Sequence, residues 1–130
     1  MIDSNRKYIF PFIWVCLITY ASVTPSNGIP DFQLFQHADK VIHFLMYLGF
    51  SFLLIPSILK KANYLRSYLL SITLSVFIGG SFELIQKFIT IDRSASWLDF
   101  LANNIGAIVG IFLYKFIVER KKIENWLFKI

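Results

Sequence analysis

The sequence has little of what soluble or disulfide-stabilised domains need. Only 16% of its 130 residues are charged and Cys16 is its single cysteine, whereas 56% of the residues are hydrophobic. Soluble domains carry about 25% charged residues. This chain has too few charged residues to form the surface of a soluble domain. One cysteine excludes a disulfide-stapled fold, and the apolar content excludes disordered and collagen-like chains. The composition therefore predicts an integral membrane protein.

The motifs of common enzyme and metal sites are also absent. The sequence contains no CxxC, no HExxH, no P-loop and no GxSxG. His37 and His43 could join Asp39 and Glu83 around a metal ion, but their spacing matches no strong template for metal binding. We therefore predict no metal and no cofactor, and no motif assigns a catalytic residue.

Four long apolar segments dominate the sequence, at about residues 8–24, 41–59, 67–89 and 97–118. Each is close to the ~20 residues that a helix needs to cross ~30 Å of hydrocarbon, and such continuous runs do not suit a strand-built barrel. The first run follows Arg6 and Lys7, as in a signal peptide, but lacks a clean cleavage site and is expected to stay as a helix. We predict an all-α membrane four-helix bundle, with residues 1–130 forming one domain.

The basic residues predict the orientation of this bundle. Ten of the thirteen lie in the N-terminal stretch, between the second and third segments, or near and after the end of the fourth; Lys40, Lys87 and Arg93 lie on the other side. Because cytoplasmic loops are rich in Lys and Arg, both termini of this multi-pass cell-membrane protein are expected in the cytoplasm. Basic clusters between apolar runs also favour membrane lipids over nucleic acid as partners.

Polar residues converge on the predicted outer ends of three segments. Asp39, His43 and Tyr47 are four residues apart and share one face of the second helix, and Asp99 and Asn103 share a face of the fourth. Polar groups at this depth are costly, so they are candidates for function by default. The candidate cluster consists of Asp39, Lys40, His43, Tyr47, Glu83, Gln86, Arg93, Ser96, Asp99 and Asn103.

A purely structural role is the alternative for each member of the cluster. The two aspartates could serve only as helix caps that complement the dipoles of their helices. Glu83 is harder to explain in this way, because it lies roughly two turns inside the third apolar segment. There an unpaired carboxylate costs a few kcal/mol, so we expect a partner among Arg93, Lys87, Lys40 and a protonated His43.

Small residues predict how the helices pack. Gly106 and Gly110 form a GxxxG face on the fourth helix, and Gly79 belongs to a stripe of small residues on the third that ends at Glu83. Such faces let two helix backbones approach closely. We expect the third and fourth helices to pack along these stripes and to bring Glu83 next to Asp99 and Asn103. A homo-oligomer formed through the same face is the competing use.

The candidate residues also resemble a known family. The resemblance is carried by Asp39-Lys40-x-x-His43, by Glu83-x-x-Gln86, and by Arg93-x-x-Ser96-x-x-Asp99-x-x-x-Asn103-x-x-Gly106-x-x-x-Gly110. This pattern, from about residue 39 to residue 110, resembles the VanZ-like family, although Asp92 stands where a proline often precedes the arginine. The resemblance implies a small bacterial membrane protein of the cell envelope with no settled biochemical activity. The family takes its name from a protein linked to teicoplanin resistance, so a link to glycopeptide antibiotic susceptibility is implied as well.

Three hypotheses for function follow. The favoured one is a non-enzymatic protein whose outer polar cluster binds an envelope lipid or a partner protein, with Arg93 and Lys40 meeting an anionic headgroup. The second is a membrane-embedded enzyme that acts on a lipid-linked substrate, with Glu83, Asp99 and His43 as acid–base groups. The third is an assembly subunit in which the polar groups only hold the helices together.

Overall fold

The computed structural model describes residues 6–24, 37–58, 63–89 and 96–119, and within these ranges the regular structure is helical throughout. The helices are α1 (Arg6–Val23), α2 (Ala38–Ile58), α3 (Tyr64–Ile89) and α4 (Trp97–Leu113), and α4 continues as a π-helical segment, η3 (Tyr114–Glu119). The prediction of an all-α membrane four-helix bundle is therefore confirmed.

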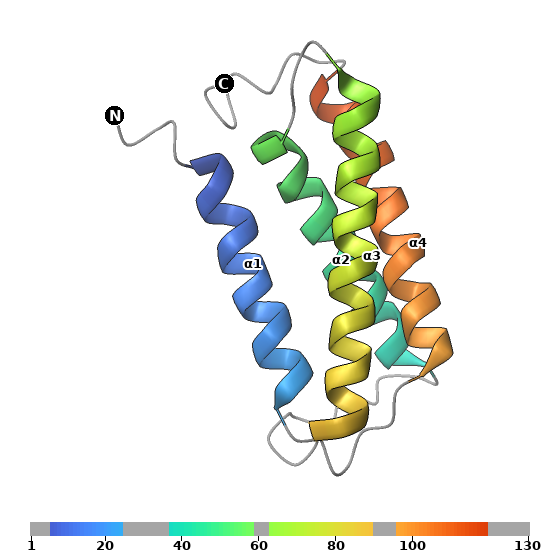
Figure 1. Cartoon of the computed structure of the whole chain (residues 1–130). Coiled ribbons are helices and arrows are strands. Elements are labelled where there is room, and N and C mark those ends of the chain that lie inside the picture. The colour runs from blue at the N-terminus through green and yellow to red at the C-terminus, as the bar shows by residue number, and fades with distance from the viewer. Residues whose placement is uncertain (1–5, 25–36, 59–62, 90–95, 120–130) are drawn as a thin grey trace.

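Three stretches are long and apolar enough to cross a membrane, namely Ala38–Ile58, Tyr64–Ile89 and Trp97–Val118. Helix α1 has 18 residues, which at ~1.5 Å per residue give about 27 Å, slightly less than the hydrocarbon thickness. It packs against α2 and α3 at one side of the bundle (Figure 1). That α1 also crosses the membrane remains a prediction.

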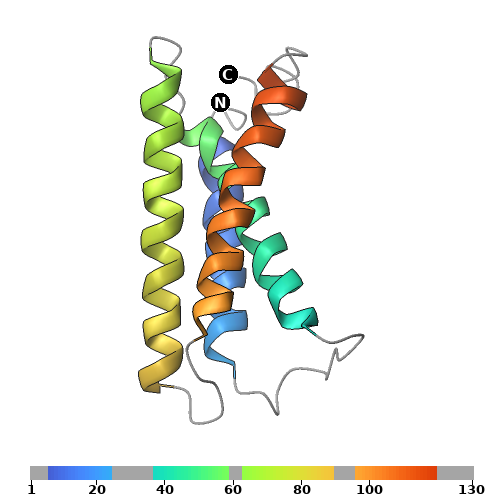
Figure 2. The same ribbon diagram turned by 90° about the vertical axis from the view of Figure 1, so that its right-hand side faces the viewer.

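The helices run alternately in opposite directions, so the ends of α1 and α3 and the starts of α2 and α4 lie at one end of the bundle (Figure 1). Helices α2 and α4 cross each other, as Figure 2 shows, and form the most extensive helix pair. Helix α1 packs against α2, where the Trp14 indole N–H donates a hydrogen bond of 2.8 Å to the Met46 carbonyl. Residues far apart in the sequence therefore meet at the end where α2 and α4 begin.

Helices α2 and α3 begin earlier than their apolar runs predict. Asp39 lies in the first turn of α2, where a negative charge complements the helix dipole. At the start of α3, the Asn63 side chain accepts a hydrogen bond of 3.1 Å from the backbone N–H of Arg66, which caps the helix. Polar residues before each run therefore extend both helices.

The GxxxG face of α4 packs on α2. A Cβ atom added to Gly106 would overlap the backbone of Phe44, and one added to Gly110 would overlap the Ser51 hydroxyl. That hydroxyl crosses the interface and donates a hydrogen bond of 2.8 Å to the Ala107 carbonyl. The prediction that this face packs on α3 was wrong, because the pattern specifies a close backbone approach but not the helix that makes it.

Small residues on α3 nevertheless face inward, as the serine and glycine spacing indicates. Ser71, Ser75 and Gly79 are buried, and a Cβ on Gly79 would lie 3.2 Å from the Tyr47 ring and 3.5 Å from Cβ of Asn103. Glu83 is the next member of this stripe and is also buried. The Glu83 carboxylate of α3 therefore lies on the face of this helix that packs against α2 and α4.

Candidate functional site

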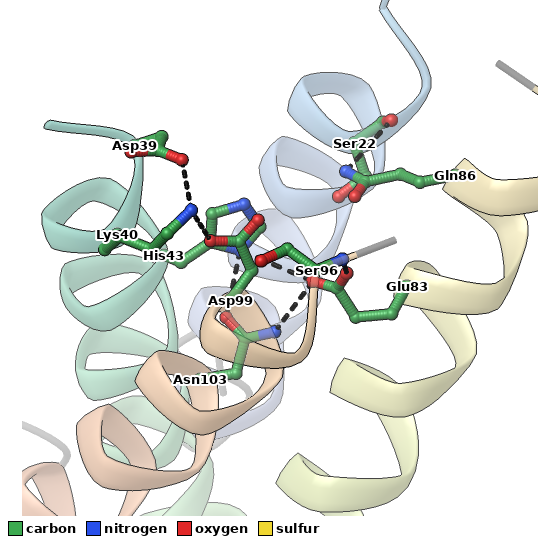
Figure 3. A network of polar contacts seen from close by, with 9 residues as sticks. All are labelled: Ser22, Asp39, Lys40, His43, Glu83, Gln86, Ser96, Asp99 and Asn103. Carbon is green, nitrogen blue, oxygen red and sulfur yellow. Dashed lines mark hydrogen bonds and ion pairs between the residues drawn. The ribbon is translucent and has the colours of Figure 1, made fainter. Parts of the chain in front are cut away.

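Six of the predicted site residues meet at the end of the bundle where α2 and α4 begin (Figure 3). We call this group the polar mouth. It consists of Asp39, Lys40 and His43 from α2, Glu83 from α3, and Asp99 and Asn103 from α4.

An ion-paired lysine lies at the outer edge of the polar mouth. Lys40 Nζ is 2.5 Å from Oδ2 of Asp39 and 2.6 Å from Oδ1 of Asp99. The Asp39 side chain is 57% exposed, whereas that of Asp99 is only 11% exposed. Since a buried carboxylate needs a compensating charge, Lys40 neutralises Asp99 and the pair joins the starts of α2 and α4.

Asn103 connects the histidine and the glutamate deeper in the polar mouth. Its Oδ1 is 3.0 Å from Nδ1 of His43, and its Nδ2 donates to Oε1 of Glu83 at 3.5 Å. An ionised carboxylate can only accept, so the amide nitrogen faces Glu83 and the amide oxygen accepts from the N–H at Nδ1 of His43. His43 Nδ1 also lies 3.9 Å from Oε1 of Glu83. One buried carboxamide thus sets the positions of groups from two other helices.

The second oxygen of Glu83 is held by the start of α4. The backbone N–H of Ser96, the N-cap residue of α4, donates to Oε2 of Glu83 at 3.2 Å. The first N–H groups of a helix lack partners within it and carry the positive end of its dipole, so they suit a carboxylate. Glu83 is therefore held by Ser96 and Asn103, with His43 nearby, whereas Lys40 pairs with the two aspartates.

Tyr47 lies below the polar mouth and is only 2% exposed. Its ring packs against Gly79, and its hydroxyl is within electrostatic reach of the Glu83 carboxylate. Within the part of the chain that the structure describes, this hydroxyl has no hydrogen-bond partner. A buried hydroxyl without a partner is rare, because the lost hydrogen bonds with water are not replaced.

Of the remaining predicted site residues, one lies apart from the polar mouth, one contacts it through its backbone, and one is outside the described residues. Gln86 turns towards α1, where its Nε2 donates to the carbonyl of Ser22 at 3.4 Å (Figure 3). Ser96 contributes its backbone N–H to Glu83. Arg93 lies outside the described residues, so its predicted contact with a headgroup stays a prediction.

Sequence reasoning assigned no residue of the first helix to the site, yet Ser22 is buried next to Gln86. The sequence does contain a feature that could have predicted this contact. Ser22 is a polar residue in the last turn of the first apolar segment. In a bundle of alternating helices, that segment ends on the same side of the membrane as Gln86.

Exposed aromatic residues surround this end of the bundle. Tyr20 near the end of α1, Phe88 near the end of α3 and Trp97 at the start of α4 are all strongly exposed. Tryptophan and tyrosine are enriched at the level of the lipid headgroups. These side chains indicate that the polar mouth lies near a membrane–water interface.

Comparison with known protein families gives a match over most of the chain. The sequence model of a family described as VanZ/LLP1 matches residues 4–118, which is nearly the whole chain. No curated protein and no solved structure matches the chain. The matched range contains all four helices and every residue of the polar mouth.

Proposed function

Since this chain belongs to the VanZ/LLP1 family, we propose that it is a bacterial cell-envelope protein whose polar mouth binds the headgroup of an envelope lipid. The observation that carries the proposal is the gathering of six polar side chains from three helices at one end of a membrane-spanning bundle. Polar groups within membrane helices are costly to bury, and they commonly mark a binding site.

The side of the membrane follows from charge. In the sequence, ten of the thirteen basic residues lie within the first turn of α1, between α2 and α3 or in the first turn of α3, or near and after the end of α4. We therefore propose that the polar mouth faces the outside and that both termini are cytoplasmic, with α1 as a fourth membrane span.

A lipid fits the chemistry and the depth of the site. The Lys40 side chain is 24% exposed, so its ammonium group can add a phosphate oxygen to its two carboxylate contacts. The exposed Trp97 and Phe88 flank the end at which Lys40 lies, at the level where headgroups and acyl chains meet. The alternative ligand of the polar mouth is a membrane protein with an anionic segment, and the experiment must distinguish it from a lipid.

Binding of lipids from a bacterial extract tests this proposal. The wild type and a Lys40→Gln variant are purified in detergent, incubated with the extract and washed, and the retained lipids are measured by mass spectrometry. A lost charge-assisted hydrogen bond of about 1.5–3 kcal/mol should reduce retention of the bound anionic lipid by about tenfold or more.

Lys87→Gln is the matched control, because Lys87 is an exposed lysine near the same end whose Nζ lies over the Phe88 ring. Retention should stay at the wild-type level in this variant. Equal lipid retention in all three proteins would refute lipid binding at the polar mouth, and retention of a protein instead would favour the partner alternative.

Catalysis on a lipid-linked substrate is the second candidate function. One observation favours it: His43, Glu83 and Asp99 each place one nitrogen or carboxylate oxygen within 4.8 Å of the others. Glu83→Gln keeps an acceptor oxygen for Ser96 or Asn103 but removes the exchangeable proton that acid–base catalysis requires. Disappearance of a lipid-linked substrate with the wild type but not with this variant would establish the enzyme; lipid binding without turnover would establish the binding protein.

Susceptibility to glycopeptides is the phenotype that we propose to score in cells. A strain that lacks the protein is complemented with the wild type, with Lys40→Gln or with Lys87→Gln, and the minimum inhibitory concentration of teicoplanin is measured. If lipid binding at the polar mouth underlies the phenotype, Lys40→Gln should behave like the empty vector and Lys87→Gln like the wild type.

A further inference from the structure

We propose that His43, Glu83 and Asp99 form a binding site for one divalent metal ion of the zinc type. One potential ligand atom from each residue lies within 4.8 Å of the other two. His43 Nδ1 and Glu83 Oε1 are 3.9 Å apart, and two ligands at ~2.0–2.2 Å from one ion can be at most about 4.4 Å apart. The full spread of 4.8 Å slightly exceeds this limit, so the side chains must move closer together before all three can bind one ion.

The charge of the site favours a cation. Within the described residues, the polar mouth contains three carboxylates, and the ammonium group of Lys40 is shared between Asp39 and Asp99. Lys87 lies over the Phe88 ring. Glu83 is therefore left without a full cationic partner among these residues, in a segment long and apolar enough to span a membrane. A divalent ion between Glu83 and Asp99 would neutralise both.

A buried hydroxyl close to the three residues also indicates a ligand site. If His43 binds the ion through Nδ1, this nitrogen must first give up the proton that it donates to Oδ1 of Asn103. The Tyr47 hydroxyl, on a side chain that is 2% exposed, has no partner among the described residues and lies within electrostatic reach of Glu83. A water molecule or anion bound to the ion would give this hydroxyl a hydrogen-bond partner.

The type of ion follows from the ligands. One imidazole and two carboxylates suit Zn²⁺ better than Mg²⁺ or Ca²⁺, which prefer oxygen ligands alone. Three protein ligands leave a coordination position open, as in catalytic zinc sites. This inference rests on the proposed function in one respect. A phosphate oxygen of the lipid would fill the open position on the ion, which explains how a site rich in carboxylates can bind an anionic headgroup.

Isothermal titration of the purified full-length protein in detergent tests the inference, with ZnCl₂ as the probe and MgCl₂ and CaCl₂ as comparisons. We expect about one Zn²⁺ per chain and an affinity at least tenfold lower in His43→Ala and in Glu83→Gln. His37→Ala, which removes the exposed second histidine, is the matched control and should bind as the wild type does.

Zinc X-ray absorption on the wild-type protein keeps the inference testable even where a variant fails to fold. It should show nitrogen and oxygen ligands at about 2.0–2.1 Å, scattering from one imidazole, and no sulfur ligand. Absence of saturable Zn²⁺ binding, or a spectrum without an imidazole, would overturn the metal site.

The lipid-retention assay, repeated with EDTA, separates the two proposals. Lipid retention that falls with EDTA and returns with Zn²⁺ supports the metal site. If EDTA has no effect on lipid retention and the protein binds no Zn²⁺, the metal site is overturned and the proposed lipid binding stands. If the protein binds Zn²⁺ but retains no lipid, the metal site stands and the proposed lipid binding is overturned.

Discussion

At the scale of single residues, Asn103 makes the contacts that define the polar mouth. It is 1% exposed, and its carboxamide joins His43 of α2 to Glu83 of α3 from its own position on α4. Both ends of the carboxamide are used: its nitrogen must face the carboxylate of Glu83, and its oxygen therefore faces Nδ1 of His43. Removing it leaves two polar groups in an apolar environment at once.

Asn103→Ala should therefore lower the free energy of unfolding by about 1–3 kcal/mol, the cost of leaving a buried polar group without its partner. Stability is measured by thermal unfolding in detergent or by SDS titration. Asn104→Ala is the matched control, because the Asn104 side-chain oxygen has no hydrogen-bond partner among the described residues, and this change should stay within about 0.5 kcal/mol. Equal effects of the two substitutions would show that the Asn103 bonds contribute little.

The sequence predicted much of the residue-scale arrangement, including Glu83 next to Asn103, but not the other pairings. Spacing placed Asp99 and Asn103 on one face of a helix, and both are buried on that face. Spacing along one helix says nothing about which groups on another helix lie opposite. The sequence therefore did not predict that Lys40 pairs with the two aspartates. Nor did it predict that Glu83 accepts a hydrogen bond from the Ser96 backbone N–H, because a pattern of side chains does not reveal backbone donors.

At the scale of helices, α2 and α4 pack so closely that their separation is set by glycine. A Cβ on Gly106 would overlap backbone atoms of Phe44, which cannot rotate away as a flexible side chain could. The sequence pattern predicted a close helix contact, and the structure supplies the partner, because the choice among helices depends on the shapes of all of them.

Gly106→Ala should push α2 and α4 apart and destabilise the protein by about 1–3 kcal/mol, the usual cost of overpacking. Gly80→Ala is the matched control on α3, since its Cβ would meet only Phe100 at an ordinary 3.5 Å. That change should be neutral or stabilising by up to about 1 kcal/mol, because alanine favours helix more than glycine does. Thermal unfolding of both variants in the same detergent would decide, and a tolerated Gly106→Ala would contradict the packing described for α4.

At the scale of the whole molecule, alternating helices put the polar mouth and the start of α3 at opposite ends of the bundle (Figure 1). The two ends can be told apart with single cysteines in a Cys16→Ser background, because Cys16 is the only cysteine. Asp39, Trp97 and Asn63 are exposed positions that suit this substitution.

In intact cells, a membrane-impermeant maleimide should label Asp39→Cys and Trp97→Cys but not Asn63→Cys, which should react only after the membrane is permeabilised. Lys7→Cys tests α1, and if α1 crosses the membrane it should behave like Asn63→Cys. Labelling of Asp39→Cys and Trp97→Cys from opposite sides would disprove the arrangement of the polar mouth.

The pairing of α2 with α4, described above, also bears on how the protein is made. The helices leave the ribosome in chain order, so α2 enters the bilayer before the helix against which it packs most extensively has been synthesised. Until α4 arrives, Lys40 lacks Asp99 and His43 lacks Asn103. The nascent protein therefore passes through a stage with unmatched polar groups in lipid, and a truncation before α4 should be a substrate for membrane quality-control proteases.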